Sequence, residues 1–96
     1  MSERSQEKEL FRQLLSAYCD LGASAQLSHE SGRLDRFFEF LDQRNTVFMQ
    51  LSEYDNKLRR SGLDMGEDVT CRETWEKGRL NHDYIEQAIM EMRNAS

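Results

Sequence analysis

None of the 96 residues is proline, the residue that breaks a helix because it lacks an amide hydrogen and its ring clashes with the preceding turn. Glu, Leu and Arg are the commonest residues, and all three favour helix. No β-branched run alternates with period two over a useful distance, so the sequence offers little support for strands. We therefore expect an all-α protein.

The apolar spacing divides the chain into three helices within a single domain, residues 1–96. The expected ranges are about 3–28, 33–60 and 68–93. At ~1.5 Å rise per residue, the middle helix is roughly 40 Å long. Three long helices with short connections favour an antiparallel, up-down-up three-helix bundle with coiled-coil-like packing.

Glycines and capping residues indicate where these helices end. Gly32 is the expected boundary between the first two helices, as either a sharp turn or a kink. Arg59–Arg60 followed by Ser61–Gly62 predicts the end of the second helix, and Leu63 stands where a Schellman turn makes its hydrophobic contact. The candidate N-caps are Ser2 or Ser5 for the first helix, and Asp64 or Asp68 for the third.

The first and third helices each show one apolar face at the three-and-four spacing of an amphipathic helix. In the first helix this face contains Leu10, Phe11, Leu14, Ala17, Tyr18, Leu21 and Ala25. In the third it is a seam of roughly heptad spacing that contains Cys71, Trp75, Gly78, His82, Ile85, Ile89 and Met92.

The second helix is apolar over an arc of about 220°, wider than the arc of somewhat more than 100° that one partner surface requires. A central helix packed against both neighbours would use much of that width. Alternatively, part of the arc, centred on Phe40, Val47 and Met49, is uncovered and available for docking. The two interpretations are compatible. In either case the expected core positions are Leu34, Phe37, Leu41, Phe48 and Leu58.

Charge and composition exclude several classes of function. The formal net charge of −5 lacks the basic footprint that nucleic-acid backbones require, so we expect no nucleic-acid partner. No apolar run approaches the ~20 residues of a membrane span, and the first residues lack the apolar segment of a signal peptide. Cys19 and Cys71 lie far apart without a CxxC pair, which is typical of reduced cysteines in a cytoplasmic protein.

The sequence shows no catalytic or metal-binding constellation, so we expect a protein that is not an enzyme and needs no cofactor or metal. His29 and His82 have no partners at metal-ligand spacing. His82 is interpreted as a core histidine bonded to a backbone or side-chain acceptor. Arg44 lies inside the apolar arc of the second helix, where we expect a carboxylate partner.

The segment G-x-L-D-R-F-F-E-F-L-D-Q-R followed by V-F-M-Q-L-S-E-Y-D resembles the second helix of bacterial flagellar export chaperones of the FliT and FlgN type. The third helix, with its NHDYIEQAI segment, is similar in kind to the last helix of that family, so the resemblance covers roughly residues 32–93. The positions that carry it in the second helix are Gly32, Asp35, Phe37–Phe38, Leu41, Arg44, Leu51 and Asp55.

The resemblance implies a cytoplasmic bacterial chaperone that holds the helical terminal segment of a secreted flagellar subunit in an apolar groove. Such a protein prevents premature assembly and passes its client to the type III export machinery. Helix-in-groove binding needs apolar anchors at helical spacing. The partner-binding residues expected here are Phe37, Phe40, Leu41, Val47, Phe48, Met49 and Leu51 on one wall, and Ile85, Ile89 and Met92 on the other.

Two further hypotheses belong to this interpretation. In part of the family the last helix covers the groove until a client displaces it, so the segment 81–96 is a candidate autoinhibitory element. The alternative function, from a different class, is a dimeric coiled-coil adaptor or structural protein that pairs through the wide face of the second helix.

Overall fold

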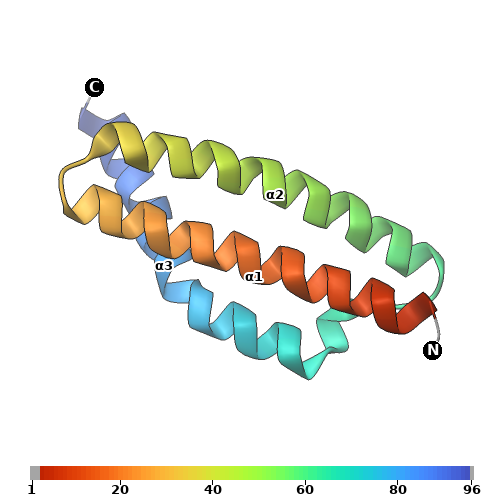
Figure 1. The fold of residues 1–96 in the computed structure, drawn as a ribbon. Helices are drawn as coiled ribbons and strands as arrows, with labels where there is room; N and C mark the ends of the chain where they lie inside the picture. Colours follow the sequence, from red (N-terminus) through yellow and green to blue (C-terminus); the bar gives the residue numbers. More distant parts are fainter. Residues whose placement is uncertain (1–2, 96) are drawn as a thin grey trace.

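The computed structural model describes residues 3–95 and confirms the all-α class and the three-helix bundle. Helix α1 covers Glu3–Glu30, α2 covers Leu34–Arg60 and α3 covers Val69–Ala95, with a short 3-10 turn, η1, at Met65–Glu67. The three helices run up, down and up along the long axis of a molecule of 50 × 20 × 18 Å (Figure 1).

Helix α1 is the central helix: it packs along α2 and along α3, whereas α2 and α3 make no comparable contact with each other. The interpretation of the second helix as the central one is therefore wrong. Small buried residues explain this arrangement, because Gly22 and Ala25 of α1 meet the part of α3 that contains Gly78 and Ala88. A Cβ atom on Gly78 would lie 2.5 Å from Cys19 Sγ, so the two helices cross too closely for any larger residue.

The buried side chains form two clusters, one toward each end of the bundle. The cluster beside η1 contains Phe11, Leu15, Leu58, Met65 and Cys71. The cluster toward the Gly32 turn contains Ala25, Phe37, Ile85 and Ala88. At both ends all three helices are held together by apolar packing, which provides most of the stability of a bundle this small.

Both expected glycine boundaries are sharp turns with positive φ, +75° at Gly32 and +85° at Gly62. The Leu63 amide donates to the Leu58 carbonyl at 2.9 Å and the Gly62 amide to the Arg59 carbonyl at 3.0 Å. This is the Schellman pattern predicted for the end of α2.

Of the two acidic candidates for the N-cap of α3, Asp68 takes that position, and Asp64 caps η1 instead. Asp68 accepts a hydrogen bond from the Cys71 amide at the start of α3, and Asp64 accepts one from the Gly66 amide in η1. Ser5 lies within the first turns of α1 and is not its N-cap, and Ser2 lies outside the described residues.

The apolar face predicted for α3 is confirmed, because Cys71, Gly78 and Ile85 are buried and the intervening seam residues are partly buried. The core face predicted for α2 is confirmed only at its ends, where Phe37 and Leu58 are fully buried. Leu34 and Phe48 are 47% and 49% exposed, so their assignment to the core is wrong. Since α2 packs on α1 alone over most of its length, its wide apolar arc is not covered.

Candidate functional site

Where α2 and α3 face each other across α1, they leave a hollow that we call the α2–α3 groove. It consists of two cavities, of about 380 Å³ and about 350 Å³, that share Phe48. We call the first the apolar cavity and the second the arginine cavity. The apolar cavity lies beside η1, and the arginine cavity lies farther along the groove toward the Gly32 turn.

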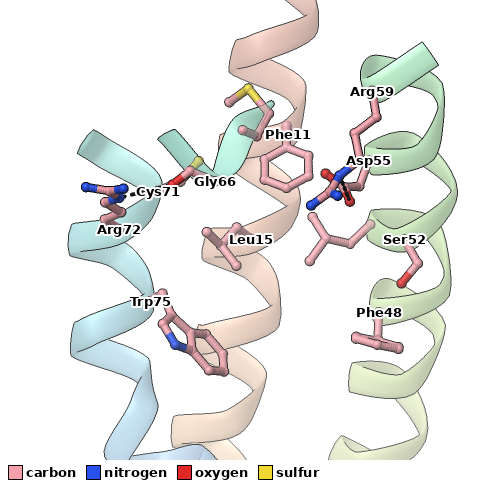
Figure 2. A pocket seen from close by; sticks show the side chains of 12 residues that line it. Phe11, Leu15, Phe48, Ser52, Asp55, Arg59, Gly66, Cys71, Arg72 and Trp75 are labelled. Carbon is pink, nitrogen blue, oxygen red and sulfur yellow. Dashed lines mark hydrogen bonds and ion pairs between the residues drawn. The ribbon is translucent and has the colours of Figure 1, made fainter. Parts of the chain in front are cut away.

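The apolar cavity exposes part of the hydrophobic core to the groove, and Figure 2 shows its lining. Phe11 and Leu15 of α1 form its floor, between Phe48 on the α2 side and Trp75 on the α3 side. Its rim is polar: on α2, Asp55 and Arg59 form an ion pair of 3.0 Å, and Arg72 lies on the α3 side. An apolar floor beneath a charged rim is the usual anatomy of a peptide-binding groove.

The arginine cavity is organised by one cation from α2. The guanidinium of Arg44 stacks over the ring of Tyr18 at 4.1 Å, and its Nη2 donates to Nδ1 of His82 at 2.7 Å. Because Arg44 can only donate, Nδ1 accepts and the His82 proton is on Nε2, which faces Glu86 at 3.8 Å. Burial raises the pKa of Tyr18, and the positive charge of Arg44 acts in the opposite direction.

This geometry corrects one expectation and refines another. Arg44 was expected to pair with a carboxylate, but among residues 3–95 no carboxylate oxygen lies within ion-pair distance of it. Its partners are a neutral imidazole and an aromatic face, which leave its charge uncompensated by direct contact. His82 is only partly buried, and its side-chain partners are Arg44 and Glu86.

An exposed apolar flank of α2 continues the groove outward. Phe48 lines both cavities, and Phe38 and Met49, which are 50% and 58% exposed, lie on the same side of α2. At ~100° per residue, Leu34, Phe38 and Met49 fall within about 60° of one another. Large exposed apolar side chains on one side of a helix are a recurrent feature of interaction sites.

The structure brings some of the expected partner-binding residues into the groove and places others elsewhere. Phe37 and Ile85 are fully buried core residues with almost no surface for a partner. Phe48 and Leu51 line the apolar cavity. Met49 is exposed and Val47 is half-buried on α2. The remaining expected residues pack, partly buried, on the core cluster near Gly32: Phe40, Leu41, Ile89 and Met92. Of these, Leu41 and Ile89 also line the arginine cavity.

The groove also contains residues that the helical spacing did not assign to partner binding. Phe11 and Leu15 of α1 and Met65 of η1 line the apolar cavity. Their exposure to the cavity depends on how the three helices pack together, which no property of a single helix reveals. Trp75 was expected on the apolar seam of the third helix. In the structure Trp75 is only partly buried and lines the apolar cavity. Its position on the seam was the one sequence feature that pointed to such a role.

Burial makes both cysteine side chains weaker acids than a free thiol. Burial and the neighbouring Asp68 raise the pKa of Cys71 to about 11, and burial also raises the pKa of Cys19. Both are thiols rather than thiolates near neutral pH, and neither forms a disulfide. Residues 3–95 contain no group of three or more His, Cys, Asp or Glu side chains arranged to hold a metal ion.

The fold and the groove define a small all-α protein of the three-helix bundle class. None of the helices in the described part of the chain has an apolar stretch long enough to cross a membrane. Searches of family models, of curated proteins and of solved structures found no match to the chain.

Proposed function

We propose that this protein is a bacterial cytoplasmic chaperone that binds the amphipathic, helical terminal segment of a secreted flagellar subunit in the α2–α3 groove. In this role it keeps the subunit from assembling before type III export and needs no catalysis. The observation that carries the proposal is the apolar cavity, where Phe11 and Leu15 of the core are reachable between α2 and α3. The sequence resemblance makes flagellar export subunits the first clients to test.

The dimensions of the groove favour a helix as the bound element. On α3 its lining extends from Cys71 to Ile89, which at ~1.5 Å per residue is about 27 Å. A partner helix of about 18 residues spans that length. Its apolar face would cover Phe48 and the α2 flank of Phe38 and Met49, which the three helices leave uncovered. The charged rim at Arg59 and Arg72 matches the polar edges of such a helix.

Trp75 makes the proposal directly measurable, because it is the only tryptophan in the chain and lines the apolar cavity. Titrating the protein with synthetic peptides of about 20 residues, taken from the helical ends of secreted flagellar subunits, should shift its emission to shorter wavelength. One peptide should bind saturably with one site per chain.

Two matched variants assign the binding to the groove. Phe48→Asp places a charge in both cavities and should weaken binding about thirtyfold, as for an aromatic anchor worth ~2 kcal/mol. Leu80→Asp makes the same kind of change on α3 at a side chain that is 76% exposed, and should leave binding unchanged. Equal losses in both variants would contradict binding in the groove. If unrelated amphipathic helices bind and flagellar ones do not, the flagellar assignment is wrong.

The adaptor alternative is favoured by one specific observation, the exposed α2 flank of Leu34, Phe38 and Met49, which could pair with the same flank of a second copy. Sedimentation equilibrium at protein concentrations from about 1 to about 100 µM, where dimers of micromolar affinity dissociate, distinguishes the chaperone from the adaptor. A chaperone that is free of client should have the mass of one chain across this range. A constant mass of two chains that Phe38→Asp reduces to one would favour the adaptor.

A further inference from the structure

Among the described residues, Arg44 has the only buried side-chain nitrogen or oxygen atom without a hydrogen-bond partner. Nη2 donates to His82, Nε is buried against α1 without an acceptor, and Nη1 donates to no described group. A buried donor without an acceptor is costly, and a charged one costs more. A half-buried guanidinium in this state is suited to a ligand that supplies acceptors and negative charge.

The carboxylate that belongs to the cavity does not supply that charge. Glu86 also lines the arginine cavity, but it faces Nε2 of His82, and the imidazole ring lies between it and Arg44. The contact of the Arg44 guanidinium with the Tyr18 ring and its hydrogen bond to His82 together restrict the movement of the side chain. The cation is therefore pre-organised, so little side-chain entropy remains to be lost when an acceptor arrives.

We propose that Arg44 binds a carboxylate of an Asp or Glu side chain carried on the apolar face of the partner helix. This inference rests on the proposed function, since it assumes that a helix occupies the α2–α3 groove. It adds a chemical requirement on the client, which is one acidic residue among the apolar anchors. An uncharged client helix would leave Arg44 covered and unpaired, which costs free energy and disfavours that helix.

The geometry also gives the spacing of the client motif. On α2, Leu51 lines the apolar cavity and Arg44, seven residues earlier, lines the arginine cavity. On α3, Trp75 lines the apolar cavity and His82, seven residues later, lines the arginine cavity. Seven residues of helix are about 10.5 Å, or two turns. A partner helix that lies along the groove should therefore carry its carboxylate seven residues from the apolar side chain that enters the apolar cavity, on the same face.

A set of three peptides tests this requirement on the unaltered protein. Each is an amphipathic helix of about 21 residues with leucines at i, i+3, i+4 and i+7 spacing. This length is slightly more than the roughly 18 residues that span the groove. The position seven residues from the central leucine is Glu, Gln or Lys. We expect the Glu peptide to bind at least about tenfold more tightly than the Gln peptide, and the Lys peptide to bind most weakly.

Substitutions in the protein test the same contact from the side of Arg44. Arg44→Gln should abolish the preference for Glu over Gln while the Gln peptide still binds, and Arg44→Lys should retain part of the preference. Arg79→Gln removes the same charge from α3 at a side chain paired with Glu76, and should retain the full preference. Circular dichroism of each variant checks that the bundle is intact, and the peptide comparison on the unaltered chain stands without any variant.

The outcomes separate the two proposals. Equal affinities for the Glu and Gln peptides would overturn the carboxylate site and leave helix binding in place. If the Arg44 and Arg79 variants lose the preference for the Glu peptide equally, the preference depends only on the overall charge of the protein. That result would also overturn the carboxylate site. Failure of all three peptides to bind would contradict helix binding by the groove, and with it the proposed function.

Discussion

Two glycines in helix interiors should respond in opposite directions to the same substitution. Replacement of glycine by alanine in a helix gains ~1 kcal/mol from backbone entropy when the new methyl group has space. At Gly22 of α1 the nearest atom to the new Cβ would be Arg44 Nε at 3.5 Å, an ordinary van der Waals distance. Gly22→Ala should therefore stabilise the protein by up to ~1 kcal/mol.

At Gly78 of α3 the new Cβ would lie 2.5 Å from Sγ and 2.9 Å from Cβ of Cys19. Rotation of the thiol could relieve the first contact, but the second requires α1 and α3 to move apart. Overpacking of this kind costs ~1–3 kcal/mol, which outweighs the propensity gain. We expect Gly78→Ala to be less stable than the unaltered protein by about 1 kcal/mol.

Urea unfolding followed by circular dichroism measures both variants. Both substitutions add one methyl group to a helix, so the difference between them isolates the helix crossing from intrinsic propensity. A stabilised Gly78→Ala protein, equal to Gly22→Ala, would refute the close approach of α1 and α3 at Cys19. It would also remove the reason given for the central position of α1.

Three further predictions follow from individual side chains. Asp68→Ala should cost ~1–2 kcal/mol, because it removes both the N-cap of α3 and the 2.7 Å ion pair with Arg12. The hydrogen bonds from Arg12 and from the Cys71 amide hold the pKa of Asp68 well below its ordinary value of 3.8. Its contribution to stability is thus complete above that value and declines as the pH falls below it, so urea unfolding from pH 7 to pH 2 should show a smaller acid loss in Asp68→Ala. The Cys71 thiol, with its pKa raised to about 11, should react with an aromatic disulfide reagent at pH 8 only on unfolding, and rapid reaction of two thiols in the native protein would contradict its burial. Phe40→Glu should lower stability by ~2 kcal/mol or more, since Phe40 packs on the core cluster near Gly32; unchanged urea unfolding would identify Phe40 as a surface anchor.

The helices and their ends could be predicted from the sequence because the interactions that form them are local. Gly62 and Leu63 make a Schellman turn with residues three and five positions earlier, and Asp68 caps an amide three positions later. The amphipathic spacing likewise identified the buried seam of α3, since a helix with one face toward its partner encodes that face in its own periodicity.

The site was predicted only in part, because its residues come from three helices. The spacing identified Phe48 and Leu51 as groove residues, and the structure places both there. It also assigned Phe37 and Ile85 to partner binding, but both side chains are almost completely buried, Phe37 in the core and Ile85 beneath the arginine cavity. A helical wheel distinguishes apolar from polar faces, but it does not distinguish an apolar face that is covered from one that is open.

The sequence by itself thus determined three amphipathic helices, their boundaries and an excess of apolar surface on α2. Only the tertiary structure decided which helix is central and where the excess surface lies. That choice depends on contacts between residues far apart in the chain, such as Cys19 with Gly78, where small side chains let α1 and α3 approach. Because α1 occupies the centre, α2 and α3 stand apart over its surface, and the groove between them follows from that separation.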